Sequence, residues 1–390
     1  MEIHTIFLAL GALLLVGLVA DEVGRRTNLP RVTLLILAGV ALGPSGLAII
    51  PAAFHDLYEF LASAALTMVA FLLGGTLTRS ALRAHGKGIV LVSLCVVILT
   101  VLCVAGGLML FGVPVIMALL LAGIATATEP AATQDAVRQL RAKGPFSDLL
   151  LGVVAVDDAW GLIAFSLLLV AAKAIAGEGG LDIMTHAIRE LGGACVLGAA
   201  IGLPAAFLTG RLKPGEPMQT EAIAVVFLCA GLAIWLDVSF LLVSMIAGVI
   251  VTNLAQHHNR PFHEIENIEW PFMILFFVLA GASLHVQSLQ TIGLIGCAYI
   301  LLRTLARFIG GWLGATLSGE PPLHRRWIGF ALVPQAGVAL GMALVATNHY
   351  PQMGETVLAI TVATTIVFEV AGPILAQVAL RKTGQAHPDQ

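Results

Sequence analysis

Two adjacent acidic residues, Asp157 and Asp158, lie in the middle of an apolar stretch that runs from Phe146 to about Lys173. This stretch is long enough to cross a bilayer as a helix, which takes about 20 apolar residues. An ionised carboxylate at mid-membrane costs on the order of 3 kcal/mol, and such residues usually have a function. We therefore interpret the pair as a proton or cation site; the alternative is a short loop between two half-length segments.

The composition of the whole chain indicates a polytopic, all-α membrane protein. Hydrophobic residues make up 58% of the 390 residues and charged residues only 11%, with a mean hydropathy of +0.97. Soluble domains carry about 25% charged residues. The five cysteines fall within apolar stretches, where we expect buried, unpaired thiols. Hydrophobicity predicts thirteen membrane spans, at residues 4–20, 30–50, 57–77, 86–112, 114–138, 146–173, 183–209, 220–235, 238–255, 268–286, 291–317, 325–347 and 355–380.

The basic residues alternate between loops in a way that supports this division. Sixteen of the 20 Lys and Arg residues fall on one side, and only Lys173 and Arg189 on the other. The last two, Arg303 and Arg307, lie within the eleventh span. Because basic loops stay in the cytoplasm, we expect an N-terminus outside the cell and a cytoplasmic C-terminus. The expected location is the inner membrane of a bacterial-type cell.

Thirteen spans predict two six-span repeats of inverted topology joined by the seventh span. The fifth span of each half is interrupted by helix-breaking residues. The sequence ATATEPAATQD contains Pro130, and ALVPQAGVALG contains Pro334, Gln335 and Gly337. Each following span carries acidic residues, the aspartate pair in one half and Glu369 in the other. Interrupted spans at matching positions are typical of transporter binding sites.

Several polar residues are predicted at the depth of the aspartate pair. At about 1.5 Å per helical residue, Asp157, Arg307 and both breaks lie roughly 12 to 18 Å from the cytoplasmic edge. An arginine at that depth needs a carboxylate partner, and we expect Arg307, with Arg303 as the alternative, to pair with Asp157. The hydroxyls of Thr126 and Thr128 and unwound carbonyls would offer hard oxygen ligands to an alkali cation. Glu129 is expected to neutralise a helix N-terminus, pair with an arginine or bind the ion.

These motifs resemble the monovalent cation:proton antiporter superfamily, in particular its bacterial NapA-like sodium/proton antiporter branch. The similar stretches are NLPRVTLLILAGVALGPSGL, the broken TATEP segment, VAVDDAWGL and RFIGGWLGATLSG, and the resemblance covers essentially the whole chain. It implies that Asp158 is the principal ion ligand and that Asp157 pairs with a basic residue of the eleventh span. The family has lysine there, and Arg307 stands in its place. Glu129 also departs from the branch's pattern.

The resemblance implies a single transmembrane antiporter domain, residues 1–390, that forms homodimers. Dimer-domain helices would cover about 4–77 and 220–286, core ion-transport helices about 86–173 and 291–380, and a linking helix about 183–209. The implied function is exchange of a monovalent cation, Na⁺ in preference to K⁺, for protons by alternating access. No cofactor, nucleic acid or enzymatic activity is expected; the partners are cations, protons and lipid. Protonation of both aspartates would make the exchange electrogenic, which the resemblance favours, whereas an Asp157 held ionised would make it electroneutral.

Three other functions are weighed against sodium/proton exchange. A potassium/proton antiporter would use the same groups. A sodium-coupled organic-anion symporter is disfavoured, because no anion-binding cluster accompanies the aspartates. An intramembrane aspartyl protease needs two facing carboxylates that share a proton. Neighbouring residues of one helix point about 100° apart, and no GxGD motif occurs in the chain.

Overall fold

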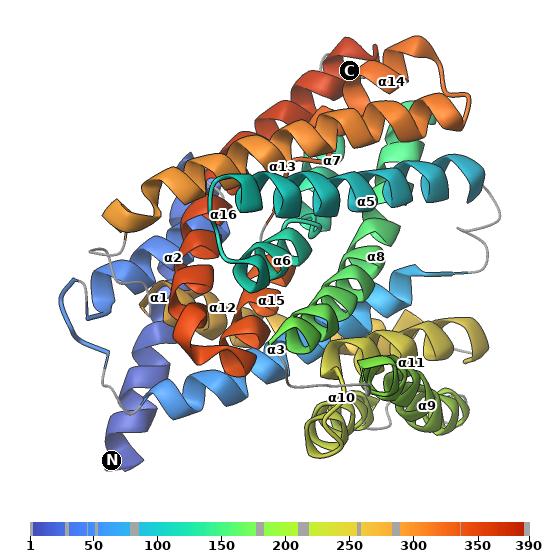
Figure 1. Ribbon diagram of the computed structural model, residues 1–390. Helices are drawn as coiled ribbons and strands as arrows, with labels where there is room; N and C mark the ends of the chain where they lie inside the picture. Colours follow the sequence, from blue (N-terminus) through green and yellow to red (C-terminus); the bar gives the residue numbers. More distant parts are fainter. Residues whose placement is uncertain are drawn as a thin grey trace. The chain divides into compact units, whose positions relative to one another are not determined.

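The computed structural model describes residues 3–27, 31–44, 46–50, 54–78, 86–176, 183–209, 218–255, 259–282, 289–335 and 337–385. Within these ranges the chain forms helices joined by turns and short extended links, with no strand (Figure 1). Helices suit a membrane, since every backbone polar group must be satisfied within the segment there. Seven of the described helices are long and apolar enough to cross a bilayer.

Every predicted span overlaps a helix or a pair of short helices. The fifth and twelfth spans are each split in two, as their proline residues predict. The stretch with the aspartate pair is one continuous helix, α8 (Pro145–Ile175), so the alternative of a loop at Asp157 and Asp158 is wrong. Proline occupies the first turn of α8 and of three other helices, where its missing N–H costs no hydrogen bond.

The chain divides into two compact units, each made from two separate stretches of sequence. Unit 1 comprises Met1–Arg79 and Gly179–Leu284. Its helices pack closely through small residues: Gly39 of α2 and Gly43, directly after α2, approach the backbone of α12, and Gly74 of α3 approaches that of α11. The helices of unit 1 are α1 (Ile3–Thr27), α2 (Arg31–Leu42), α3 (Phe54–Thr76), α9 (Ile183–Thr209), α10 (Met218–Trp235), α11 (Phe240–Leu254) and α12 (Asn259–Ala282).

Unit 2 comprises Ser80–Glu178 and His285–Gln390 and contains both broken spans. The long helices α5 and α13 pack against each other, and a Cβ on Gly310 of α13 would lie 2.8 Å from the Cα of Val96. The helices of unit 2 are α5 (Gly86–Leu110), α6 (Val115–Ile124), α7 (Pro130–Gln139), α8 (Pro145–Ile175), α13 (Leu289–Leu317), α14 (Pro322–Ala331), α15 (Gly337–His349) and α16 (Pro351–Lys382).

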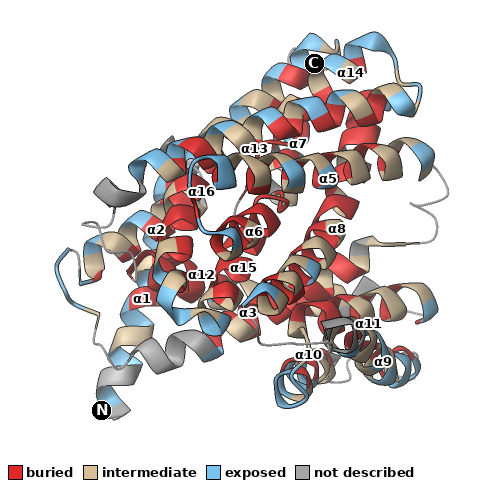
Figure 2. Ribbon diagram, viewed as in Figure 1, coloured by how far each residue is buried: buried red, intermediate tan, exposed pale blue. Residues whose placement is uncertain are grey.

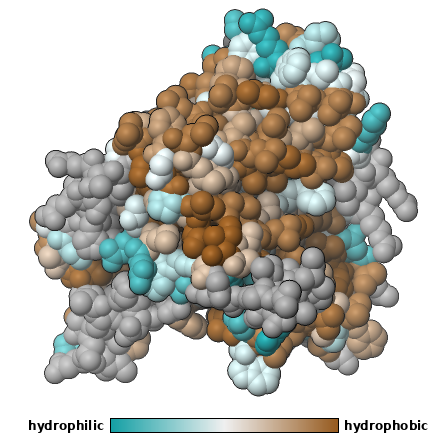
Figure 3. All heavy atoms as spheres, in the orientation of Figure 1, coloured by the Kyte–Doolittle hydropathy of each residue, from teal (hydrophilic) through white to brown (hydrophobic). Residues whose placement is uncertain are grey.

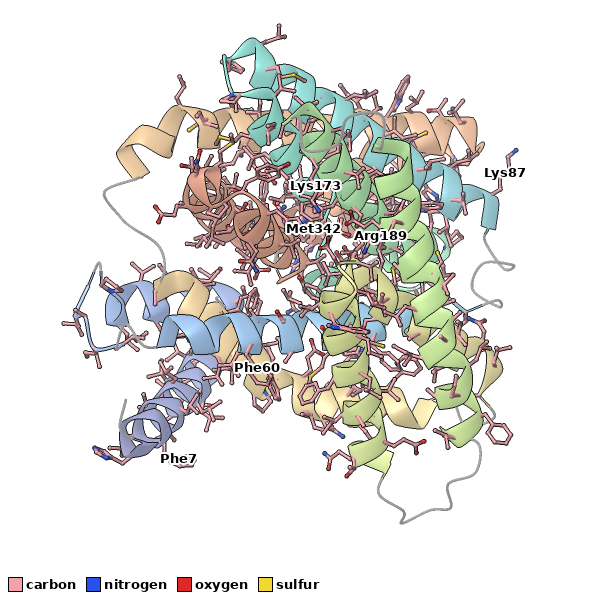
Figure 4. All side chains as sticks on the ribbon, turned by 60° about the horizontal axis from the view of Figure 1, so that its bottom comes forward. Phe7, Phe60, Lys87, Lys173, Arg189 and Met342 are labelled. Carbon is pink, nitrogen blue, oxygen red and sulfur yellow. The ribbon has the colours of Figure 1, made fainter. Side chains whose placement is uncertain are left out.

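The short helices α6 and α15 lie at the buried centre of unit 2, and most of each is red in Figure 2. They contact each other. Their 10 and 13 residues span only about 15 and 20 Å at 1.5 Å per residue, less than the hydrocarbon core of about 30 Å. Met342 of α15 is fully buried, whereas Lys87 and Lys173 lie in the end turns of α5 and α8 (Figure 4).

The outer face of unit 2 is apolar where it is formed by α5 and α13 (Figure 3). Its exposed side chains include Ile98, Leu102, Leu301, Leu305 and Trp312. A face of this kind suits contact with lipid tails. The five cysteines are free thiols, but only Cys229 is buried; Cys195 and Cys297 are exposed on helix surfaces, so the prediction of buried thiols is wrong for these two.

Candidate ion site at the two helix breaks

Two interruptions of regular helix meet the middle of α13. The first is the link of residues 125–129 between α6 and α7, and the second is the link 332–336 between α14 and α15, described except for residue 336. Glu129 has extended backbone geometry and is the N-cap of α7, and Pro130 is the first residue of that helix. Each break leaves carbonyl groups at a helix C-terminus without the partners of a continuous helix.

Arg303 of α13 supplies donors to the carbonyls of both breaks. Its guanidinium donates to the carbonyl oxygens of Ala125 at 3.0 Å and Ala127 at 2.8 Å in the first break. It also donates to Val333 at 2.7 Å and Pro334 at 3.5 Å in the second. The side chain is fully buried, and its guanidinium carbon lies 4.3 Å from the ring centroid of Phe368. Arg303 thus holds the two interrupted segments against one helix.

Arg307, one turn further along α13, forms an ion pair with Asp157. Its Nη1 donates to Oδ2 of Asp157 at 2.6 Å, and both side chains are fully buried. Its Nη2 donates to the main-chain carbonyls of Ala125, Thr126 and Ala127. A buried pair of this kind is stable only when further hydrogen bonds satisfy the charged groups, and the carbonyls of the first break do so here.

Asp158 points to the first break and has no basic partner among the described residues. Its Oδ1 accepts hydrogen bonds from the main-chain N–H of Thr128 at 3.0 Å and from the hydroxyl of Thr128 at 3.1 Å. Its Oδ2 is buried and has no hydrogen-bond partner in the described part of the chain. The Asp158 carboxylate therefore keeps one oxygen available at a site with no exposed surface.

The predicted site residues divide into groups with different contacts. Thr128 binds Asp158, but the hydroxyl of Thr126 donates to the main-chain oxygens of Gly123 and Gly161. Arg307, and not Arg303, has the aspartate as its partner. The expectation that Arg303 needs a carboxylate partner differs from the structure, because carbonyl oxygens bind its guanidinium. The positions of acidic residues in the sequence therefore do not indicate these partners.

Gln335 and Tyr299 connect the second break to the first. The amide nitrogen of Gln335 donates to the carbonyl of Ile124 at 3.0 Å and to the hydroxyl of Tyr299 at 3.2 Å. Tyr299 is not among the site residues predicted from the sequence. The available signal was its spacing, because Tyr299, Arg303 and Arg307 recur every four residues and share one face of α13. Gly337 begins α15, directly after the second break.

The structure resembles that of the sodium proton antiporter MjNhaP1 from Methanocaldococcus jannaschii at pH 8, with a TM-score of 0.81. That match has 18% identity and covers 98% of this chain and 99% of the archaeal chain, so it shows the fold. A curated relative is the ammonium/H⁺ antiporter subunit AmhT of Alkalihalophilus pseudofirmus. It is 24% identical over 320 residues, which cover 78% of this chain and 79% of the relative.

A second curated relative is the high-affinity Na⁺/H⁺ antiporter NhaS3 of Synechocystis, 23% identical over 274 residues. The match covers 67% of this chain but only 59% of the cyanobacterial protein. Residues 10–381 match the family described as "Sodium/hydrogen exchanger, transmembrane". That match includes both breaks, the aspartate pair and both arginines. The chain is therefore a member of the sodium/hydrogen exchanger family, within the monovalent cation:proton antiporter superfamily of secondary transporters.

Proposed function

We propose that this antiporter exchanges Na⁺ for protons and that Asp158 binds the two ions alternately. The observation that carries the proposal is the carboxylate of Asp158, fully buried with one free oxygen beside Thr128. A bare carboxylate is costly in a membrane interior. States in which a proton or a cation neutralises Asp158 therefore have a lower free energy than the bare carboxylate. Competition of two ions for one such group gives obligatory exchange when the loaded site moves across the membrane.

The ligands around Asp158 suit a small, hard cation. Its Oδ2 and the hydroxyl oxygen of Thr128 are hard oxygen donors, the type that alkali and alkaline-earth cations prefer. The two arginines are already bound by Asp157 and by carbonyl oxygens. This arrangement gives little room for an organic anion, and it supports the cation antiporter over the sodium-coupled anion symporter.

The proposal extends to the arrangement in the membrane. Unit 2 would carry the ion and move relative to unit 1, which would form the homodimer contact, with the helix of residues 183–209 as the link between them. In the structure that helix, α9, is grouped with unit 1. Exposed apolar side chains on α1, such as Phe7 and Leu15, support a surface there that faces lipid or a partner. The alternation of basic loops supports a bacterial-type inner membrane location with the N-terminus outside.

Replacement of Asp158 tests the exchange function directly. Purified protein in proteoliposomes with an internal pH dye should move protons when NaCl is added outside. Asp158→Asn should abolish this response, because an amide binds neither a proton nor a cation as a carboxylate does. The matched control is Asp148→Asn, an exposed aspartate in the first turn of the same helix, which should leave exchange unchanged.

The cation is identified in the same assay by adding LiCl, KCl and NH₄Cl in separate experiments. We expect half-maximal exchange at the lowest concentration with Na⁺. A lower value with K⁺ would favour the potassium/proton alternative, and one with NH₄⁺ would place this chain with its ammonium-transporting relative. Full activity of Asp158→Asn with any cation, in protein that elutes as a single species, would show that Asp158 is not the exchange site.

A further inference from the structure

Glu369 of α16 is a second buried acidic residue at the helix breaks, outside the site of Asp158. Its side chain is only 4% exposed. The preceding Phe368 lies under the guanidinium of Arg303. Three residues later, a Cβ on Gly372 would lie 2.6 Å from the Cα of Pro334, so α16 closely approaches the second break. Helix α16 also contacts α7, and the carboxylates of Glu369 and Glu129 interact electrostatically.

Three oxygen atoms of α16 around Glu369 lack the usual hydrogen-bond donors. Oε1 of Glu369 and the hydroxyl of Thr365 are buried without a partner in the described ranges. The two residues are four apart and share one face of the helix. Pro373, inside α16, has no N–H to donate to the carbonyl of Glu369. Other buried threonines of α16 behave differently, since Thr361 and Thr364 donate to carbonyls one turn earlier.

The acidic residues at the two breaks are close enough to influence one another electrostatically. Four described carboxylates interact here in sequence: Asp157 with Asp158, Asp158 with Glu129, and Glu129 with Glu369. Two arginines, Arg303 and Arg307, oppose them. An ionised Glu369 with an unpartnered oxygen is unfavourable in this buried position, so either a proton or a bound cation has to neutralise it.

We propose that Glu369, Thr365 and the main-chain carbonyl of Glu369 form a second binding site for a monovalent cation. The site shares Glu129 as a neighbour with the Asp158 site. Carboxylate, hydroxyl and free carbonyl oxygens next to a helix irregularity are the ligands that membrane transporters offer to Na⁺. The ion bound there is the cation of the proposed exchange, held at a site separate from Asp158. The proposal thus rests on the proposed function for the identity of its ion.

Transport kinetics of Glu369 and Thr365 variants test this site. Glu369→Gln and Thr365→Val should each raise the Na⁺ concentration for half-maximal exchange about tenfold, a change of about 1.4 kcal/mol, and lower the maximal rate less. The matched controls on the same helix are Glu355→Gln, an exposed carboxylate, and Thr361→Val, a buried hydroxyl already bound to a carbonyl. Both controls should stay within twofold of the unsubstituted protein. Glu369→Asp, which keeps the charge, should give an intermediate value.

A binding measurement separates this inference from the function of Asp158. In purified Asp158→Asn protein, NaCl but not choline chloride should still raise the melting temperature, because ligand binding stabilises the folded state. Adding Glu369→Gln should remove that response. An Asp158→Asn protein that no longer responds to Na⁺, or a Glu369→Gln protein with unchanged kinetics, would overturn the second site. Absence of exchange in the unsubstituted protein would instead overturn the proposed function.

Discussion

At the scale of single residues, the two aspartates differ in what binds their oxygens. Asp157 has Oδ2 bound by Arg307, and Asp158 has Oδ1 bound by Thr128. The other oxygen of each is buried and has no donor in the described parts of the chain. Asp157 can therefore accept a proton on Oδ1 without releasing Arg307. This geometry supports the expectation that both aspartates titrate during a cycle, although arginine itself does not release its proton near neutral pH.

Replacement of Asp157 should change the charge moved per cycle. If two protons exchange for one cation, the unsubstituted protein should produce a transient current on a supported membrane when Na⁺ is added. Asp157→Asn keeps a hydrogen-bonding side chain but removes one protonatable group. We expect Na⁺-driven proton movement to persist, at a reduced rate, while the current disappears. Equal currents from both proteins, or no current from either, would contradict the two-proton scheme.

At the scale of secondary-structure elements, one face of α13 organises both breaks. Arg303 bonds to carbonyls of the two interrupted segments, and Arg307 adds bonds to the first. Carbonyls at helix ends normally accept hydrogen bonds from water or from capping groups. In a buried site they need protein donors, and two guanidinium groups provide several each. The first break is fixed by two arginines that follow it by about 180 residues in the chain. The second break is fixed by Arg303, which precedes it by about 30 residues.

Arg303→Gln should destabilise unit 2 as a whole. The amide replaces at most two donors, so carbonyls of both breaks lose their partners, at about 1–3 kcal/mol for each group left unsatisfied. We expect a clearly lower melting temperature and a lower exchange rate. Arg326→Gln, at an exposed arginine of α14, should change stability by no more than about 0.5 kcal/mol. A melting curve of Arg303→Gln that matches this control would show that Arg303 does not join the breaks.

The sequence was sufficient to locate the breaks, the continuous acidic helix and the pairing of Arg307 with Asp157. These features depend on local signals, namely proline within apolar stretches and charges at similar depth. The role of Arg303 could not be predicted in the same way. Its partners are main-chain carbonyls, which every residue carries, and their position depends on how the links bend. The direction of the Thr126 hydroxyl likewise depends on the close approach of Gly161.

At the scale of the whole molecule, the chain passes between the two units three times, near residues 79, 178 and 284. Both breaks, the aspartate pair and Glu369 belong to unit 2. We expect unit 2 to move relative to unit 1 when the bound ion changes. The exposed native cysteines Cys195, in unit 1, and Cys297, in unit 2, provide positions for testing this motion.

Spin labels on these two cysteines should report the motion after the other three cysteines are replaced by serine. Double electron–electron resonance should give different distance distributions for protein at low pH and for protein saturated with Na⁺ at higher pH. The Asp158→Asn protein should give one distribution under both conditions. Identical distributions in the active protein would exclude a rigid-body movement of the two units along the line between the labels.

The separation of 150 residues between Asp157 and Arg307 has a consequence for biosynthesis. At about 5–20 residues per second, the ribosome needs on the order of 10 s after making the aspartate before it makes the arginine. During this interval α8 must reside in the translocon or in the bilayer without its counter-ion. Because an ionised carboxylate is costly in the bilayer interior, the protonated form of the aspartates has the lower free energy at this stage. The ion pair can form only after Arg307 of α13 has been made, and the second break joins it later still, because Val333 and Pro334 follow α13 in the chain.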